Sequence, residues 1–406
     1  MSKQRTVIIG AGQAGGTVAA NLRQLGYDGE ITVIGAEDWP PYERPPLSKT
    51  LLQGKIETER TYIRPPAFYA EQDIELITGR QVLEVNRSQR LLQLDDGDRR
   101  GYESLVIATG ARARRLNIPG ADHPRVHVLR DIGHALALRS ALAKSERLLI
   151  VGGGFIGLEI AASARALGLS VDLIEQAPTL MGRVLPPHVA SHLAGIHAGR
   201  GVMLHTGVAL HSFEHRPDGG LIAQTSIGPI EADVVAVGIG SIPNTELAAT
   251  AGLSIDDGVL VDEFGRTEDE RIWAAGDVTR HFNPLLGRYI RLESWKNAQN
   301  QAIAVAKSIA GQPSAYAELP WLWSDQYDLN FQLAGMPRGG EELVWRGTPD
   351  DTCFTVFGLT GDTPSFAITV NQGREMRFAQ QLIVRGAPVD VTRLADVSIP
   401  LQRMVA

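Results

Sequence analysis

Two segments of the chain share one pattern of hydrophobic and polar positions. The first begins at Thr6 and reads TVIIGAGQAGGTVAANLRQLGYDGEITVIGAE, and the second begins at Leu148 and reads LLIVGGGFIGLEIAASARALGLSVDLIEQ. Each contains a short apolar run, a glycine cluster, an Ala- and Leu-containing stretch typical of a helix, and another apolar run. Strand, helix and strand with such short connections predict a βαβ unit in a parallel sheet. Two such units predict two doubly wound domains.

Each unit is followed by a second, weaker repeat. Residues 79–111 and 207–240 both alternate polar and apolar positions around Gly/Asp turns, then form an apolar strand that ends in glycine. From about Pro320 the pattern changes, because WLWSDQYDLNFQLAG, CFTVFGL and SFAITVNQ are typical of antiparallel strands with one face in solvent. We therefore predict an α/β protein with two Rossmann-like domains and a small α+β C-terminal domain, which begins after GQPSAYAELP.

Composition agrees with a globular protein and excludes several classes. The 406 residues are 44% hydrophobic and 21% charged, with a formal net charge of −7, which excludes disordered, collagen-like and coiled-coil chains. The pI of 5.8 gives no reason to expect nucleic acid as a partner. The apolar run before Gly10 is too short for a signal peptide, and no run approaches the roughly 18 residues of a membrane helix. We expect a soluble, cytoplasmic protein.

The single cysteine, Cys353, excludes an internal disulfide, a CxxC redox pair and an iron–sulfur cluster held by four thiolates of this chain. We expect Cys353 to be a buried, small apolar side chain. We expect no metal site. His188, His192 and His197 fall at helical spacing, and we expect them on a polar helix face.

The first glycine cluster is a dinucleotide-binding pattern. Gly10, Gly12 and Gly15 form GxGxxG directly after the strand TVII. The first glycine allows the tight turn, the second lets a pyrophosphate approach the backbone, and the third lets the helix pack on the strand. The phosphates then lie at the positive helix N-terminus. Glu37, after the second strand, is the candidate for the ribose hydroxyls, or else a solvated loop carboxylate.

The second cluster has the fuller pattern. Gly152, Gly154 and Gly157 follow the strand LLIV, and the next strand ends at Glu175. A carboxylate there accepts hydrogen bonds from a free 2′-hydroxyl and repels a 2′-phosphate, which favours NAD over NADP. Glu159, two residues after Gly157, is either a site residue or a first-turn carboxylate that the helix dipole favours.

Two dinucleotide sites imply electron transfer between two cofactors, and five further motifs make the resemblance specific. The chain resembles the FAD-dependent NADH:ferredoxin reductases of bacterial oxygenase systems, of the putidaredoxin reductase and biphenyl dioxygenase ferredoxin reductase type. The motifs are PPYERPPLSK (40–49), SLVIATGA (104–111), TEDERIWAAGD (267–277), RLESWKNAQNQA (291–302) and PWLWSDQYDL (320–329).

This resemblance implies a fold of the glutathione reductase type and assigns its parts. Residues 1–112 and 241–319 would form a discontinuous FAD-binding domain, residues 113–240 the NAD-binding domain, and residues 320–406 the C-terminal domain. Where this chain has Ala36, close relatives often carry Asp, so the ribose contact shifts to Glu37 or weakens.

The resemblance also implies site residues. Besides the glycines above, the cofactor-binding residues would be Ala14, Glu37, Arg44, Lys49, Val82, Ala108, Thr109, Gly110, Arg130, Ile156, Glu159, Glu175, Gly240, Asp277 and Trp295. The candidate catalytic residues are Lys49, Glu159 and Trp295, with Lys49 stabilising negative charge near flavin N5 and Glu159 as its partner. Without the context of the motifs, the cations Arg44, Lys49 and Arg130 would be read as surface residues. Asp277 would be read as a helix N-cap and Trp295 as part of the core.

The implied function is an NADH:ferredoxin oxidoreductase. NADH would deliver a hydride to FAD, which would pass single electrons to a [2Fe–2S] ferredoxin (Rieske-type or plant/vertebrate-type) that serves an aromatic-ring dioxygenase or a cytochrome P450. The helix after the first strand has no CxxxxC pair, so electrons must leave the flavin directly. Basic residues near the motifs are candidates for partner docking: Arg288, Arg291, Lys296 and Arg338.

Three alternatives stay open at this point. Rubredoxin reductases and monodehydroascorbate- or quinone-type reductases share the flavin core. A flavoprotein that responds to NADH by changing its interactions, without turnover, belongs to another class. A monomer and a weak dimer are both compatible with the sequence.

Overall fold

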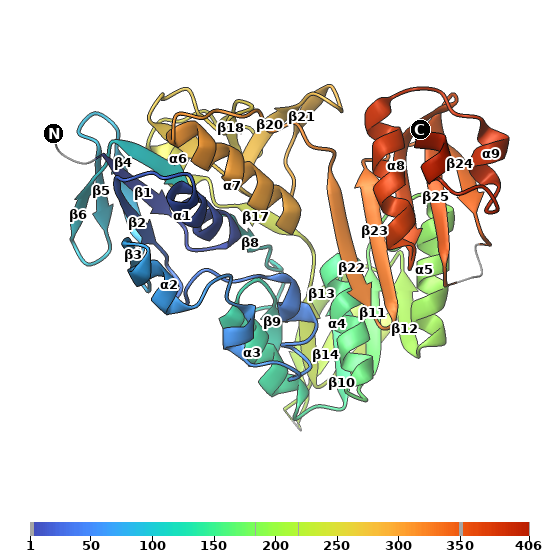
Figure 1. The fold of residues 1–406 in the computed structure, drawn as a ribbon. Helices are drawn as coiled ribbons and strands as arrows, with labels where there is room; N and C mark the ends of the chain where they lie inside the picture. The colour runs from blue at the N-terminus through green and yellow to red at the C-terminus, as the bar shows by residue number, and fades with distance from the viewer. Residues whose placement is uncertain (1–3, 183, 218, 349–351, 406) are drawn as a thin grey trace. The chain divides into compact units, whose positions relative to one another are not determined.

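The computed structural model describes residues 4–182, 184–217, 219–348 and 352–405 (Figure 1). It divides into two compact units that the chain crosses several times. Unit 1 consists of Met1–Arg44, Thr58–Arg112 and Ser241–Glu318, and unit 2 of Pro45–Glu57, Ala113–Gly240 and Leu319–Ala406. Both units contain a five-stranded parallel sheet, and unit 2 also contains a five-stranded antiparallel sheet. The fold-class prediction is confirmed.

Unit 1 is built on the parallel sheet β19-β7-β1-β2-β3. Helices α1 and α7 pack together beside it, and the antiparallel meander β4-β5-β6 belongs to the same unit (Figure 1). The elements of this unit are β1 (Arg5–Ile9), α1 (Gln13–Gln24), β2 (Glu30–Ile34), a short helix (Thr58–Thr61), α2 (Pro66–Glu71), β3 (Ile74–Ile77), β4 (Val82–Asn86), β5 (Leu91–Leu94), β6 (Arg99–Gly101), β7 (Ser104–Ile107), α6 (Glu246–Thr250), β18 (Val259–Val261), β19 (Ile272–Ala274), β20 (Thr279–Asn283), β21 (Arg288–Ile290) and α7 (Trp295–Ile309). Strands β8 (Ala111–Ala113) and β17 (Ser241–Pro243) lie where the chain changes unit.

Both faces of this sheet are buried, which explains the continuous apolar runs in the sequence. Along β1, Val7 and Ile9 point into the core shared with the meander, whereas Ile8 points into the core shared with α1 and α7. The alternation follows from the two-residue period of a strand.

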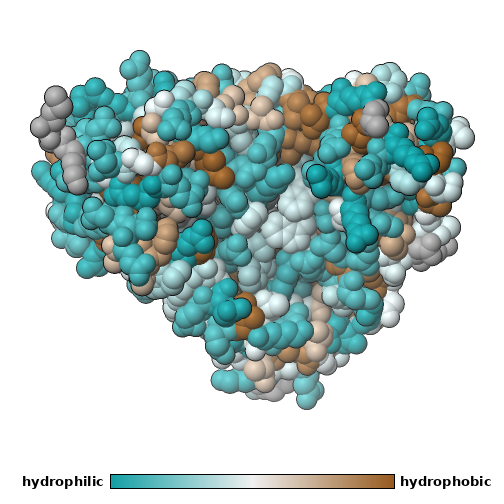
Figure 2. Space-filling view, viewed as in Figure 1, coloured by the Kyte–Doolittle hydropathy of each residue, from teal (hydrophilic) through white to brown (hydrophobic). Residues whose placement is uncertain are grey.

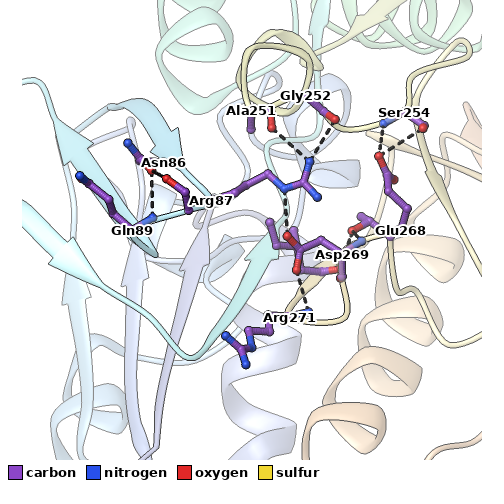
Figure 3. Close-up of polar contacts among 12 residues, drawn as sticks. Asn86, Arg87, Gln89, Ala251, Gly252, Ser254, Glu268, Asp269 and Arg271 are labelled. Atoms are coloured by element: carbon purple, nitrogen blue, oxygen red, sulfur yellow. Dashed lines mark hydrogen bonds and ion pairs between the residues drawn. The ribbon is translucent and has the colours of Figure 1, made fainter.

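Arg87 ties the meander of unit 1 to two loops that are distant in sequence (Figure 3). Its guanidinium forms an ion pair with Asp269 at 2.9 Å and donates to the backbone oxygen of Gly252 at 3.1 Å. Beside it, the carboxylate of Glu268 accepts from the backbone N–H of Ser254 at 2.8 Å. These contacts hold together the meander, the loop at Gly252 and Ser254, and the loop at Glu268 and Asp269, which do not pair with one another as strands.

Unit 2 contains the parallel sheet β12-β11-β10-β16-β9, the meander β13-β14-β15 and the antiparallel sheet β22-β23-β26-β25-β24. Its elements are a short helix (Pro45–Ser48), β9 (Val126–Val128), α3 (Ile132–Leu142), β10 (Arg147–Val151), α4 (Phe155–Ala166), β11 (Ser170–Glu175), α5 (Pro187–Gly199), β12 (Val202–Thr206), β13 (Leu210–His215), β14 (Leu221–Thr225), β15 (Gly228–Ala232), β16 (Val234–Val237), β22 (Trp321–Gln326), β23 (Leu329–Gly335), β24 (Glu342–Arg346), β25 (Phe354–Thr360), β26 (Thr363–Val370), α8 (Gly373–Arg385), α9 (Val391–Ala395) and α10 (Gln402–Val405).

The expectation that the C-terminal sheet has one face in solvent is wrong for its central strands. All residues of β25 from Phe354 to Leu359 are buried. Helix α8 packs on β26 and β23. On the other side, His192 of α5 contacts Phe354 edge-to-face, with ring centroids 5.0 Å apart. The sequence of the sheet alone does not show that helices cover both of its faces.

Two further expectations about single residues are corrected. Cys353 is exposed rather than buried, and the Gln372 side-chain amide donates to its sulfur at 3.0 Å. His188 is exposed on α5 as expected, but His197 has no exposed surface. It faces the C-terminal sheet because α5 packs there, so the three histidines do not share a polar face.

The surface is largely hydrophilic on the face in Figure 2, with hydrophobic residues in small separate areas. Exposed large apolar residues of unit 1 include Phe282 and Tyr289, which contact each other on the β20-β21 hairpin with ring centroids 5.6 Å apart. Among the residues described, no helix is long and apolar enough to cross a membrane.

His281 should make the stability of unit 1 depend on pH. Its side chain is buried against Tyr316, and neither ring nitrogen has a hydrogen-bond partner among the described residues. Burial lowers its pKa to about 4, whereas an unfolded histidine titrates near 6.5. As the pH falls from about 6.5 towards 4, the unfolded state therefore gains a proton that the folded state does not.

We predict that this difference lowers the free energy of unfolding by up to about 3 kcal/mol between pH 7 and pH 4. Replacing His281→Phe should keep the contact with Tyr316 and remove this part of the pH dependence. Urea unfolding of both proteins at a series of pH values measures the free energy of unfolding. An equal change of this free energy with pH in both proteins would contradict the prediction.

Candidate functional site

The first glycine turn joins β1 to α1 through direct backbone contacts. Gly10 has a φ of +112°, and a Cβ atom there would lie 2.1 Å from the backbone oxygen of Ala108. At Gly15, a Cβ atom would lie 1.9 Å from the backbone oxygen of Gly10. Neither distance is possible for a real side chain, so both positions require glycine and hold the helix against the strand.

The N-terminus of α1 is open. Its N-cap residue, Gly12, supplies no side chain to accept from the first N–H groups, and the first turn has no acidic residue. A Cβ atom at Gly12 would meet a single neighbour within 4 Å, the Arg44 guanidinium at 3.9 Å. Unpaired N–H groups beside a cation form an anion-binding position.

Arg44 is held beside Gly12 by Glu37 and Tyr42. The guanidinium forms an ion pair with Glu37 at 3.0 Å and lies over the Tyr42 ring at 5.1 Å, and the Tyr42 hydroxyl donates to Glu37 at 2.6 Å. Burial opposes the charged form, but Tyr42, Glu37 and Asp277 together raise the pKa of Arg44 above its ordinary value. Two predicted site residues from different motifs, Glu37 and Arg44, therefore lie in direct contact.

Asp277 follows a glycine that packs against α1. A Cβ atom at Gly276 would lie 3.0 Å from the Cβ of Ala14 and 3.7 Å from that of Ala298 on α7. The alternative that Asp277 is a helix N-cap is wrong, because a turn and then strand β20 follow it. Ser294 is the N-cap of α7, with its hydroxyl accepting from Asn297.

The remaining predicted residues of unit 1 lie around the same sheet. Val82 belongs to the core cluster that contains Ile9, and Ala108 is buried behind Gly10. The backbone oxygen of Thr109 accepts from Asn244 at 2.9 Å, and that of Gly110 accepts from the Asn244 backbone N–H at 2.9 Å. Trp295 is the first residue of α7 and is half-buried, so it is not a core residue.

The second glycine turn, between β10 and α4, repeats this geometry. Gly152 has a φ of +108°, and a Cβ atom at Gly157 would lie 2.0 Å from its backbone oxygen. Gly154 is an N-cap without a side-chain hydrogen bond, and a Cβ atom there would have a single neighbour, at 3.9 Å. Ile156 is 41% exposed beside it, which leaves an open apolar contact at the helix N-terminus.

Glu175 lies at the end of β11 and points to this turn. One carboxylate oxygen accepts from the backbone N–H of Gly153 at 2.7 Å, and the other accepts from that of Ala177 at 2.8 Å. Both bonds fix the carboxylate in place, and each oxygen keeps a lone pair for a further donor.

Glu159 is a buried charged residue of unit 2. Its carboxylate forms an ion pair with Lys49 at 3.0 Å and accepts hydrogen bonds from Ser48 and, at 2.6 Å, from Ser324. It is 4% exposed and is the fifth residue of α4, so the alternative of a first-turn carboxylate is wrong. The structure thus brings the candidate pair Lys49 and Glu159 together.

Two other predicted residues of unit 2 follow strands of its parallel sheet. Arg130 follows β9 and is half-buried, and Gly240, with a φ of +102°, is exposed after β16. The backbone oxygen of Gly240 accepts from the N–H of Arg114 at 2.9 Å.

Two of the four candidate docking cations, Arg291 and Lys296, are matched by carboxylates. Arg291 forms ion pairs with Glu293 and, at 3.3 Å, with Asp257, and Lys296 lies 3.7 Å from Glu318. Such pairs reduce the positive field that an acidic partner would meet.

Sequence reasoning missed several residues that hold the site residues in place. Ser48 and Ser324 donate to Glu159, and Tyr42 donates to Glu37. Each lies inside a motif that the sequence had singled out: Tyr42 and Ser48 in PPYERPPLSK, and Ser324 in PWLWSDQYDL. Their position in those motifs was the available signal.

Comparison with known proteins decides the family. Residues 4–302 match the pyridine nucleotide-disulphide oxidoreductase family, and residues 321–405 match the reductase C-terminal family. The chain belongs to the pyridine nucleotide-disulphide oxidoreductases. Within this family it is a member of the ferredoxin–NAD(+) reductase enzymes, which confirms the resemblance seen in the sequence.

The relatives extend over the whole chain. It is 44% identical to the ferredoxin–NAD(+) reductase component of the anthranilate 1,2-dioxygenase system of Burkholderia cepacia, over 99% of each chain. It is 38% identical to rhodocoxin reductase of Rhodococcus erythropolis, over 98% of this chain and 94% of that protein. A chain in the crystal structure of the covalent putidaredoxin reductase–putidaredoxin complex matches with a TM-score of 0.96 and 36% identity, over 100% and 99% of the two chains.

Pyridine nucleotide-disulphide oxidoreductases use FAD and NAD(P)H, and the two open helix N-termini fit such dinucleotides. At both, glycine leaves the first-turn N–H groups accessible where a side chain would otherwise block or cap them. The family name refers to a disulphide, but this oxidoreductase has one cysteine, so its electrons do not pass through an internal disulphide.

The two kinds of glycine in unit 2 give a direct test of this geometry. Gly157→Ala should lower the free energy of unfolding by about 2 kcal/mol or more, because its methyl group would overlap the Gly152 oxygen. Gly195→Ala should raise it by about 1 kcal/mol, because Gly195 lies in the interior of α5 and no described atom beyond the adjacent helix backbone comes within 4 Å of the new methyl. Denaturant unfolding compares them, and equal effects would contradict the close packing.

Proposed function

We propose that this chain is an NADH:ferredoxin oxidoreductase, which takes electrons from NADH and delivers them one at a time to a [2Fe–2S] ferredoxin. The ferredoxin would in turn serve an aromatic-ring dioxygenase or a cytochrome P450. The observation that carries the proposal is the pair of uncapped, glycine-lined helix N-termini, one in each unit, in a chain with a single cysteine. The full-length relatives that carry ferredoxin reductase names support it.

Unit 1 would hold FAD. Gly10, Gly12 and Gly15 would receive the pyrophosphate at the start of α1, and the Arg44 guanidinium beside Gly12 would balance its charge. Glu37, which has a lone pair left after binding Arg44 and Tyr42, would accept from the adenosine ribose. When bound, FAD supplies a group that accepts two electrons together and releases them singly.

FAD contacts are also proposed for the remaining residues that the resemblance assigns to this cofactor. These are Ala14, Val82, Ala108, Thr109, Gly110, Asp277 and Trp295, together with Lys49 and Arg130. Of the cations among them, Lys49 has a buried carboxylate partner, which holds the ammonium in one position.

Unit 2 would bind NADH as substrate. Gly152, Gly154 and Gly157 would receive its pyrophosphate at α4, with Ile156 and Gly240 lining the site, and Glu175 would accept from the adenosine ribose hydroxyls. A carboxylate held by two backbone N–H groups cannot turn away from a 2′-phosphate, so it would repel NADPH. The Lys49–Glu159 pair would position a positive charge for the electron transfer.

The function can be tested with one anaerobic experiment on the purified protein. NADH should bleach the flavin absorbance within the mixing time or soon after, and a [2Fe–2S] ferredoxin added next should restore it while becoming reduced itself. Bleaching without recovery would contradict the ferredoxin as partner and favour rubredoxin, a quinone or an interaction role. No bleaching by NADH would contradict the reductase function itself.

Glu175 should determine the choice of nucleotide. Replacing Glu175→Ala removes the acceptor for the 2′-hydroxyl and the repulsion of a 2′-phosphate, so the NADH/NADPH ratio of kcat/KM should fall by at least about tenfold. Asp172→Ala is the matched control, because this carboxylate on the same strand accepts from His205 at 2.8 Å instead. An unchanged ratio in Glu175→Ala, or the same fall in Asp172→Ala, would remove Glu175 from the ribose site.

A further inference from the structure

A continuous line of polar side chains runs through unit 2 and ends at Glu159. It consists of Tyr327, His197, Gln326, Ser324 and Glu159, which come from α4, α5, β22 and the turn after β22. Apart from Tyr327, each member is at most 4% exposed. Buried polar side chains in such a line need a complete set of partners, because an unpaired one would be costly.

Each link has the length of an ordinary hydrogen bond. Ser324 Oγ lies 2.6 Å from Glu159 Oε1, and Gln326 Nε2 lies 3.0 Å from Ser324 Oγ. Gln326 Oε1 lies 2.8 Å from His197 Nε2, and His197 Nδ1 lies 3.1 Å from the Tyr327 hydroxyl oxygen. All of these distances lie within one compact unit.

The Glu159 carboxylate at the end of the line determines which group donates in each hydrogen bond. A carboxylate can only accept, so the Ser324 hydroxyl donates to Glu159, and the Gln326 amide nitrogen donates to Ser324. The Gln326 oxygen then accepts from His197 Nε2–H. Burial lowers the pKa of His197, which keeps the ring neutral at pH 7 and leaves Nδ1 to accept from the Tyr327 hydroxyl. All donors therefore point towards Glu159.

This line is not suited to carrying protons. In a proton relay, each link must accept a proton on the atom from which it then donates one. Gln326 accepts through its oxygen and donates through its nitrogen, so a proton would have to cross the carboxamide. A line of fixed donors interrupted by an amide instead orients the group at its end.

The backbone conformation of Tyr327 supports a specific role for this residue at the end of the line opposite Glu159. It is one of the two residues that connect β22 and β23, and its φ of +58° is strained for a side chain of this size. Asn or Gly would relieve that strain, but neither provides a hydroxyl at the end of a ring that reaches His197. The Tyr327 ring also lies 5.2 Å from the guanidinium of Arg200, which forms an ion pair with Asp328.

The three partners of Glu159 come from two different parts of the chain. Ser48 and Lys49 are neighbours in one segment, so they can move together with it. Ser324 is the partner that the C-terminal sheet supplies, and Gln326 and His197 hold its hydroxyl in place. Without Ser324, one lone pair of the carboxylate would be open, and rotation of the carboxylate would weaken its bond to Lys49.

We propose that Ser324, supported by Gln326 and His197, is a positioning residue that fixes the Glu159 carboxylate in the orientation in which it holds the Lys49 ammonium. The positioning itself is independent of the reaction. Its consequence for NADH oxidation rests on the function proposed above.

Competitive acylation of lysines tests the positioning without relying on activity. The purified protein is treated with a trace of acetic anhydride, and mass spectrometry gives the labelling of Lys49 relative to Lys55, an exposed lysine nearby in sequence. In Ser324→Ala the ratio should rise about fivefold, the equivalent of one hydrogen bond of about 1 kcal/mol. Ser324→Thr, which keeps the hydroxyl, should restore the original ratio.

Ser365→Ala is the matched control for the same sheet, because Ser365 donates to the backbone oxygen of Gly358 rather than to this line. In Ser365→Ala, the labelling of Lys49 relative to Lys55 should equal that in the unchanged protein. An unchanged ratio in Ser324→Ala, or an equal rise in Ser365→Ala, would overturn the proposal. If Ser324→Ala does not fold, Gln326→Met removes the next link, and an unchanged ratio there would overturn it as well.

The rate of flavin reduction by NADH gives a second measurement. Ser324→Ala should lower the rate constant about fivefold, and the same substitution in a Glu159→Gln background should have no further effect. An equal loss in both backgrounds would mean that Ser324 acts independently of Glu159 and would overturn the proposal. Failure of NADH to reduce the unchanged protein, with the shift in Lys49 labelling intact, would reject the proposed function and leave the positioning supported.

Discussion

Both units depend on one close contact, in which a backbone oxygen of the glycine turn touches the first turn of the following helix. At Gly15 and Gly157, a side chain would begin 1.9 and 2.0 Å from the oxygen of the preceding glycine turn. This contact sets the distance between helix and strand. Other glycines of the same clusters, Gly12 and Gly154, leave the helix N-termini without a capping side chain. Different glycines of one cluster therefore allow close packing and provide the open, positively polarised position at which a dinucleotide can bind.

A buried charge organises unit 2 in a different way. Glu159 cannot be buried without partners, and the chain supplies them from two segments far apart in sequence, at Ser48–Lys49 and at Ser324. The segment Pro45–Glu57 thus packs with unit 2, although the residues on both sides of it belong to unit 1. Ion pairing and hydrogen bonding at this carboxylate, together with the bonds of Ser163 to Gln53 and to the backbone of Ser48, hold this short segment to unit 2.

Two arginines, the buried Arg346 and the half-buried Arg87, have a comparable role in the irregular parts of the fold. Arg346 has an almost completely buried side chain that forms an ion pair with Glu375 and donates to the backbone oxygens of Leu394 and Ile399. Arg87 links its meander to two loops in the same manner. Because a guanidinium offers five donors in a fixed plane, one residue can satisfy several backbone oxygens that have no strand or helix partner.

The sequence by itself determined the features that depend on neighbouring residues. The glycine spacings, the parallel sheets with meanders and the acidic residue at the end of β11 are local patterns, since the strand, turn and helix that they require lie within about 30 residues. Tertiary structure alone decided the environment of His197, the exposure of Cys353 and the strand after Asp277. It also brought Ser324 to Glu159, because burial and hydrogen bonding there depend on segments more than a hundred residues apart.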